Sequence, residues 1–154
     1  MVQLVTVGAE HATNAAARSE QTASTVAVGL AVFAALQLGL ALFMAVAPHA
    51  FFTAIGPFGA FNAHYIRDVA SFYGAIGVGL LLAIGRPGWR VPVLALTTVQ
   101  YALHSVNHLL DIAKAHPAWT GYFDFVSLAA ATALLAWLWR TAAMQARTPA
   151  GAAP

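Results

Sequence analysis

The fold is decided by residues 24–47, which read STVAVGLAVFAALQLGLALFMAVA and contain no charged side chain. A helix needs about 20 residues, at about 1.5 Å each, to cross the hydrocarbon core of a bilayer. Gln37 is the one strongly polar residue inside the stretch, and Pro48 stands directly after it, where proline ends a helix. The stretch therefore predicts a transmembrane helix.

The composition of the whole chain agrees with a membrane environment. Of its 154 residues, 60% are hydrophobic and 8% are charged, whereas an ordinary soluble domain carries about 25% charged residues. So few charges exclude a soluble enzyme and a disordered chain. The net charge of +2 comes from scattered arginines and not from a basic patch, which excludes a nucleic-acid binder. The chain has no cysteine, so disulfides and thiolate-ligated metals are excluded as well, and we predict an integral membrane protein embedded in the lipid bilayer.

Three further apolar stretches are long enough to cross the bilayer, and short segments connect them. Short connections favour antiparallel neighbours. We therefore predict an all-α fold, a polytopic membrane protein with four transmembrane helices in an antiparallel bundle. The weakly patterned ends of the chain are expected to be mobile tails. The predicted helices cover residues 24–47, 64–85, 91–112 and 121–138 within a domain of residues 23–140, and the tails are residues 1–22 and 141–154.

The basic residues are unevenly divided between the two predicted faces of the membrane domain. One face holds Lys114, with Arg67 at the membrane edge. Cytoplasmic loops carry an excess of Lys and Arg, so the richer face predicts a multi-pass protein with both termini in the cytoplasm. The residues on that richer face are Arg18, Arg86, Arg90, Arg140 and Arg147.

Small residues at four-residue spacing predict where the helices pack. Ala31, Ala35 and Gly39 form such a series on the first helix, and Ala70 and Gly74 form another on the second. Small side chains let helix backbones approach closely inside a membrane. We therefore expect both series to face neighbouring helices.

Ionisable residues gather at the outer end of the predicted bundle. His64 and Asp68 lie one turn apart on the second helix, and His104 and His108 lie one turn apart on the third. Burying such groups in a bilayer is costly, and they usually face one another inside a bundle. We therefore expect the polar faces of these two helices to converge, with Asp124 of the fourth helix alongside.

This cluster has the composition of a metal site, because imidazole and carboxylate groups suit zinc, iron(II) or manganese. Arg67 is a candidate clamp for an anionic group, and Tyr101 shares the stripe of His104, so both are candidate cofactor-binding residues. Asp124 is expected to do no more than favour the start of the fourth helix. The predicted metal ligands are His64, Asp68, His104, His108 and Asp111.

Several functions fit such a site, and the sequence assigns no catalytic residue and leaves open whether the protein is an enzyme. The first is a metal-dependent oxidoreductase or hydrolase that acts on a lipid-soluble substrate. The second is a haem b or quinone protein, in which His64 and either His104 or His108 take the axial positions. The third is a non-catalytic accessory or scaffold subunit of a homo-oligomer or larger membrane complex. A transporter or proton relay is the fourth.

The motifs of the second and third helices resemble those of a known family. Asn62-Ala-His64-Tyr-Ile-Arg67-Asp68 is followed by Gln100-Tyr-Ala-Leu-His104 and then by Asn107-His108-Leu-Leu-Asp111. From residue 48 to residue 138 the chain is similar to a family of small bacterial four-helix integral membrane proteins, uncharacterised in activity and DoxX-like in layout. The resemblance implies the four-helix fold, the choice of site residues and a bacterial inner (plasma) membrane, but it implies no activity.

Overall fold

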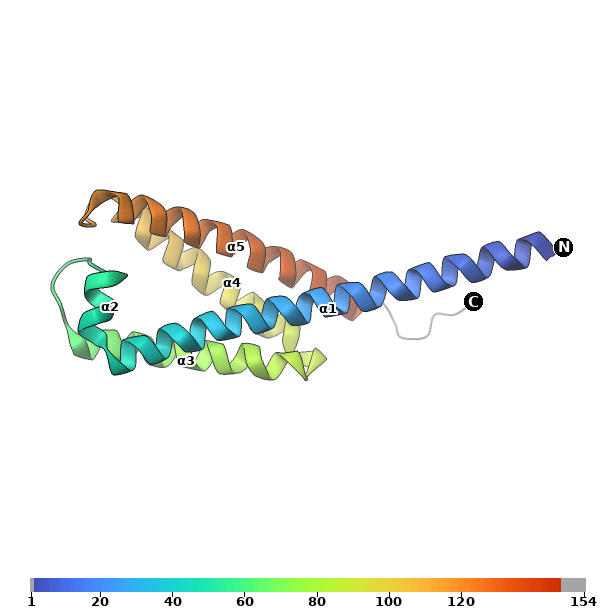
Figure 1. Ribbon diagram of the computed structural model, residues 1–154, viewed down its shortest axis with the longest axis horizontal. Coiled ribbons are helices and arrows are strands. Elements are labelled where there is room, and N and C mark those ends of the chain that lie inside the picture. The colour runs from blue at the N-terminus through green and yellow to red at the C-terminus, as the bar shows by residue number, and fades with distance from the viewer. Residues whose placement is uncertain (1, 148–154) are drawn as a thin grey trace.

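The protein is a bundle of long helices. The computed structural model describes the backbone of residues 2–147, with side chains at 13, 14 and 17 and from residue 20 onward. Figure 1 shows the helices in chain order, and residues 2–147 contain no strand. The helices are α1 (Val2–Val46), α2 (Pro48–Ala54), α3 (Ala63–Ile84), α4 (Pro87–Leu110) and α5 (Ala118–Arg147).

Proline and capping residues set the helix boundaries. Pro48 ends α1 and begins α2, and Pro87 begins α4, where a missing N–H group costs nothing. The Asn62 side-chain oxygen accepts hydrogen bonds from the backbone N–H groups of His64 and Tyr65, at 3.0 and 3.2 Å, and so caps the start of α3. At the other end of α3, the Arg90 guanidinium donates to backbone carbonyls that the helix leaves unpaired.

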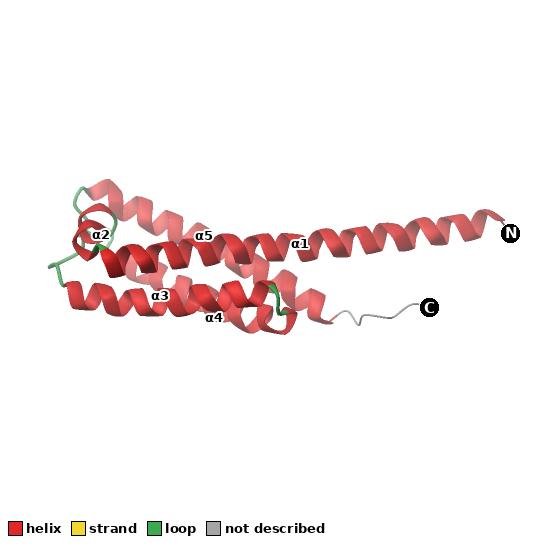
Figure 2. Cartoon of the chain, turned by 60° about the horizontal axis from the view of Figure 1, so that its bottom comes forward, coloured by secondary structure: helices red, strands yellow, loops and turns green. Residues whose placement is uncertain are grey.

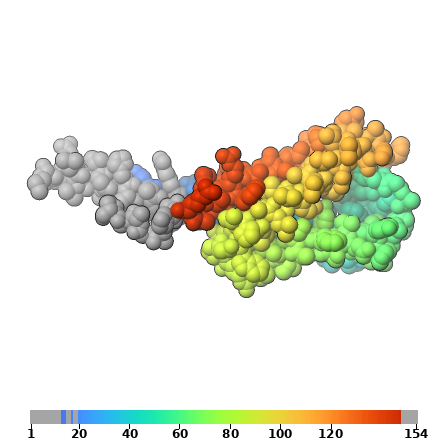
Figure 3. Space-filling model, turned by 180° about the vertical axis from the view of Figure 1, so that it is seen from behind, coloured from blue at the N-terminus to red at the C-terminus, as the bar shows by residue number. Residues whose placement is uncertain are grey.

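The bundle consists of two helix pairs. α1 packs along α3 and α4 packs along α5, while fewer contacts join one pair to the other. The pairs diverge toward the end that carries α2, and the start of α1 and the end of α5 lie at the opposite end (Figures 1 and 2). Seen from behind, α4 lies between α3 and α5 (Figure 3). The divergence of the two pairs leaves room for a site beside α2.

The interior and the surface of the bundle are both apolar. Leu30, Leu80, Leu94 and Leu135 are fully buried where the two pairs meet. Large apolar side chains also cover the outside of α1, α3, α4 and α5, which is typical of helices that face lipid on one side and other helices on the other. Examples of these exposed side chains are Leu42, Phe72, Leu96, Leu103 and Val126.

The structure confirms an all-α fold and partly supports the predicted spans. Among the residues that the structure describes, three helical segments are long and apolar enough to cross a membrane: Glu20–Val46, Ala63–Ile84 and Ala118–Arg147. The predicted fourth span, in α4, is not among them. The reason is its polar content, since Gln100, His104, Asn107 and His108 all lie on this helix.

The ends of the helices also differ from prediction. α1 begins at Val2, so most of the expected tail of residues 1–22 is helical. α5 continues to Arg147, beyond the predicted boundary at residue 140, and residues 148–154 lie outside the described part of the chain. The helix α2 has no counterpart among the predicted elements.

Of the two small-residue series predicted to face neighbouring helices, the one on α3 is confirmed and the one on α1 is wrong. Ala70 is buried, and a Cβ atom on Gly74 would lie 3.8 Å from the Cβ of Ala41, as expected for α3 packed against α1. On α1, however, Ala31, Ala35 and Gly39 are exposed, so that prediction was wrong. The contact face of α1 lies on a neighbouring side of the helix and contains Ala34, Leu38 and Ala41.

Candidate functional site

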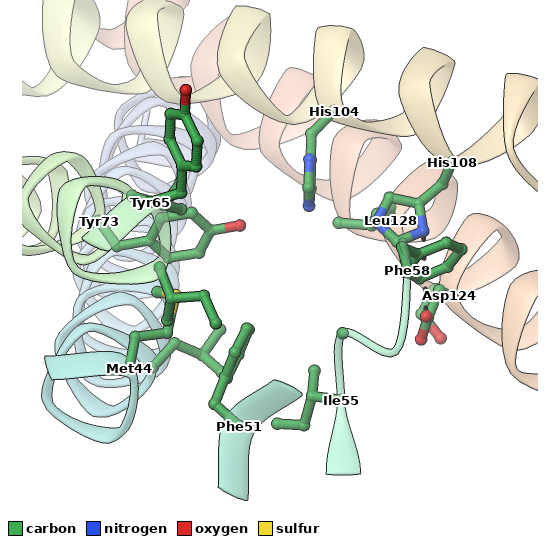
Figure 4. A pocket seen from close by; sticks show the side chains of 15 residues that line it. Met44, Phe51, Ile55, Phe58, Tyr65, Tyr73, His104, His108, Asp124 and Leu128 are labelled. Carbon is green, nitrogen blue, oxygen red and sulfur yellow. Dashed lines mark ion pairs between the residues drawn. The ribbon is translucent and has the colours of Figure 1, made fainter. Parts of the chain in front are cut away.

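A cavity of about 400 Å³ lies at the end of the bundle where the two helix pairs diverge (Figure 4). All five helices contribute to its wall, together with the segment between α2 and α3. Most of the lining is apolar or aromatic, and the polar side chains come mainly from α4 and α5. The lining consists of Leu40, Met44, Phe51, Ile55, Gly56, Phe58, Tyr65, Ile66, Val69, Tyr73, His104, His108, Asp124, Ser127 and Leu128.

His104, His108 and Asp124 form the polar wall of the cavity. The rings of His104 and His108, one helical turn apart, have centroids 4.7 Å apart. The Nδ1 atom of His108 lies 3.9 Å from the Oδ2 atom of Asp124, which is within ion-pair range and too long for a hydrogen bond. Both atoms are buried, and neither has a hydrogen-bond partner among the described residues. The wall therefore contains two buried polar atoms that can form a hydrogen bond with a bound molecule.

Aromatic rings fix the positions of the two histidines. Phe58, from the segment after α2, meets the His108 ring edge to face with centroids 5.1 Å apart. Tyr73 of α3 meets the His104 ring in the same way at 6.5 Å, and its hydroxyl group points into the cavity (Figure 4). Such T-shaped contacts are favourable beyond the area they bury. The histidines are thus held from the α3 side and from the loop side.

A second hollow, of about 430 Å³, adjoins the first. Ile55 and Asp124 line both hollows, so the Asp124 carboxylate stands between them. The second hollow also has aromatic walls, from Trp119 and Phe123 of α5. Both of these rings are largely exposed, which places this hollow at the surface.

Beneath the cavity the bundle contains a polar layer. Gln37 is fully buried one turn from Leu40 of the cavity wall, and neither of its side-chain polar atoms has a described partner. The buried Oε1 atom of Gln100 is likewise unpaired among the described residues. Ser105 and Thr132 share a hydrogen bond of 3.2 Å across α4 and α5. Unpaired buried amides of this kind are typical positions for bound water.

The structure does not bring the five predicted metal ligands together. His104 and His108 line the cavity, but His64 and Asp68 pair with each other at 3.4 Å, with 82% and 54% of their side chains exposed. Asp111 forms an ion pair of 2.7 Å with Lys114. Within the part of the chain that the structure describes, no three His, Asp or Glu residues are close enough to hold one metal ion.

The two predicted cofactor-binding residues also lie apart from the cavity lining. The Nε atom of Arg67 donates to the carbonyl of Ala45 at 3.5 Å, on the outside of the bundle. Tyr101 is buried and packs edge to face on Phe33, with ring centroids 5.8 Å apart. Tyr101 is thus a core residue at the level of Gln100 and Ser105, and Arg67 contacts the end of α1.

Asp124 is the site residue that sequence reasoning undervalued. The expectation that it lies at the helix start was wrong, because α5 begins at Ala118 and has no acidic residue in its first turn. One further turn into the helix, its carboxylate faces His108. The aromatic residues of the wall were visible in the sequence, but nothing in their spacing indicated that Phe51, Phe58 and Tyr73 would line one cavity.

Comparisons of the chain with protein-family models, with curated protein sequences and with solved structures return no match.

Proposed function

We propose that the chain is a four-span membrane protein whose cavity binds a lipid-soluble molecule that carries one polar group. The apolar lining holds the body of the ligand, and the polar group pairs with His104, His108 and Asp124. The observation that carries this proposal is the pair of unused polar atoms, His108 Nδ1 and Asp124 Oδ2, on the wall of an otherwise apolar cavity.

The energetic argument starts from the cost of leaving those atoms unpaired. A buried polar group without a partner costs about 1–3 kcal/mol, and more when it is charged. A ligand that supplies the missing hydrogen bonds removes that cost. The volume of about 400 Å³ lies within the range of about 300–1,000 Å³ found for small-molecule sites.

The fourth span of the proposal is α4, most of whose polar side chains face inward, although Asn107 near its outer end is exposed. Its buried hydroxyl groups, on Thr97, Thr98 and Ser105, donate to backbone carbonyls one turn earlier, so they are satisfied inside the helix. Its outward face is apolar and suits contact with lipid. That face contains Leu96, Val99, Leu103, Val106 and Leu110.

The orientation we propose places the cavity at the outer face of a bacterial inner membrane and both termini in the cytoplasm. Arg86 and Arg90 lie at the turn between α3 and α4, which is at the end of the bundle that holds the chain termini. Arg140 and Arg147 lie near the end of α5. This basic end is the side that the positive-inside rule assigns to the cytoplasm.

Filling the cavity tests the proposal. The probe is 2-naphthol, a neutral aromatic compound with one hydroxyl group, titrated by calorimetry into the purified protein in detergent. Leu40→Trp places a large ring in the cavity and should weaken binding at least tenfold. Leu42→Trp, on the exposed side of the same helix, is the matched control and should leave binding unchanged. Equal binding by both variants contradicts a ligand site in the cavity.

A divalent metal at the same wall is the second candidate. The pair of His104 and His108, one helical turn apart on the cavity wall, favours it, since imidazole is a ligand that zinc, iron and manganese accept. A bis-histidine haem has no such support. The two histidines of the cavity lie on one helix, and the exposed His64 does not face them.

A further inference from the structure

We propose that the cavity selects an organic cation, an amine or quaternary ammonium attached to an apolar body. The inference rests on the ligand cavity proposed above and specifies the charge of its occupant. It is drawn from the charges that line the two hollows and from the rings around them.

Asp124 is the only carboxylate that lines either hollow, and no Lys or Arg described in the structure lines them. Two basic residues of this end of the bundle are engaged elsewhere: Lys114 pairs with Asp111, and Arg67 donates to the Ala45 carbonyl. The nearest partner of the carboxylate is His108, at 3.9 Å. The Asp124 side chain is 16% exposed and its Oδ2 atom is buried, so its charge is poorly hydrated and favours positive charge nearby, and the described lining supplies no permanent one.

Aromatic rings line both of the hollows that share Asp124. Phe51, Phe58 and Tyr73 line the cavity, and Trp119 and Phe123 line the second hollow, which Asp124 also lines. The faces of aromatic rings attract cations, and quaternary ammonium groups are commonly bound among several rings. A carboxylate at the junction of two ring-lined hollows therefore matches a cation with apolar substituents better than it matches a neutral or anionic molecule.

The same charges disfavour a zwitterionic phospholipid headgroup as the source of the cation. Its ammonium group is attached to a phosphate, which would lie beside Asp124 with no described Lys or Arg in the lining to neutralise it. A cation without an attached anion avoids this repulsion. The predicted ligand is thus a free amphiphilic cation.

The test uses two probes of the same size and shape and opposite charge, tetraphenylphosphonium and tetraphenylborate. Each is titrated by calorimetry into detergent-solubilised wild-type protein and into variants, so that partition into the micelle is common to all samples. Asp124→Asn should weaken phosphonium binding at least tenfold and should not weaken borate binding. Asp111→Asn removes an exposed carboxylate at the same end of the bundle and should change neither phosphonium binding nor borate binding.

Ser127→Lys provides a second route that keeps Asp124 in place. Ser127 lines the cavity one turn from Asp124, so a lysine there supplies the missing positive charge and should also weaken phosphonium binding tenfold or more. If Asp124→Asn does not fold, the effect of Ser127→Lys on phosphonium binding tests the inference by itself. Dioleoylphosphatidylcholine added as a competitor should not displace the phosphonium, whereas displacement would identify a lipid headgroup as the occupant.

The outcomes separate this inference from the proposed function. If 2-naphthol binds and is excluded by Leu40→Trp, but phosphonium binding is absent or indifferent to both charge variants, the cavity holds ligands and the cation inference is wrong. If neither naphthol nor phosphonium binds to the wild-type protein, both proposals fail together.

Discussion

At the scale of single residues, His108 is the side chain on which metal binding depends. It is the one histidine that faces both His104 and Asp124. If the wall binds a divalent metal, His108→Ala should reduce the metal content of the purified protein at least tenfold, because it removes one of the two imidazoles of the His104–His108 pair. His116→Ala, which removes a histidine from the second hollow, should leave the metal content unchanged. Elemental analysis of both variants measures the effect, and equal metal in the two would place the ion elsewhere.

The sequence predicted His108 together with His104, and Asp124 beside them, but it wrongly added His64 and Asp68 to the same cluster. The spacing of His104 and His108 predicted a shared helix face, and both do line the cavity. His64 and Asp68 obey the same spacing rule, yet their pair is exposed. Spacing fixes which residues share a face, but it does not fix how a helix is rotated about its axis in the bundle. That rotation depends on packing against the other helices, which local pattern does not contain.

At the scale of helices, the contact between α1 and α3 depends on Gly77. A Cβ atom there would lie 2.7 Å from Leu38 Cγ and 3.1 Å from the Leu38 backbone nitrogen, so the two helices would have to separate. Gly77→Ala should destabilise the protein by about 1–3 kcal/mol through overpacking. Gly39→Ala is the matched control, because nothing lies within 4 Å of its added atom, and higher helix propensity should make it neutral or slightly stabilising. Thermal unfolding in detergent measures both, and similar losses would contradict the assigned contact face.

The helices themselves were largely predictable and their contacts were not. Long apolar runs and prolines place both ends of α3, the end of α1 and the start of α5 within a few residues of prediction, whereas α1 begins far earlier and α5 ends well later than predicted. The series Ala31, Ala35 and Gly39 follows a helical spacing much like that of the true contact face of α1, Ala34, Leu38 and Ala41, but lies on a neighbouring side of the helix. In a chain this rich in alanine, several faces of one helix satisfy the small-residue pattern. Burial, which depends on the partner helix, decides among them.

At the scale of the whole molecule, function depends on which end of the bundle faces outward. The cavity and α2 lie at one end, and the start of α1, the end of α5 and the turn between α3 and α4 lie at the other (Figure 1). A ligand from outside the cell reaches the cavity directly only if the α2 end is the outer one. The basic residues of the turn are the reason we propose that orientation.

Single cysteines test this orientation directly, because the chain has no cysteine of its own. Ala60→Cys lies in the exposed segment before α3, and Gly88→Cys lies in the exposed first turn of α4, where an added side chain meets nothing within 4 Å. In intact cells a membrane-impermeant maleimide should label Cys at 60 and not Cys at 88, and detergent should make both reactive. The reverse pattern would place the cavity in the cytoplasm. It would leave the ligand site intact but require that its ligand come from inside the cell or from the inner leaflet.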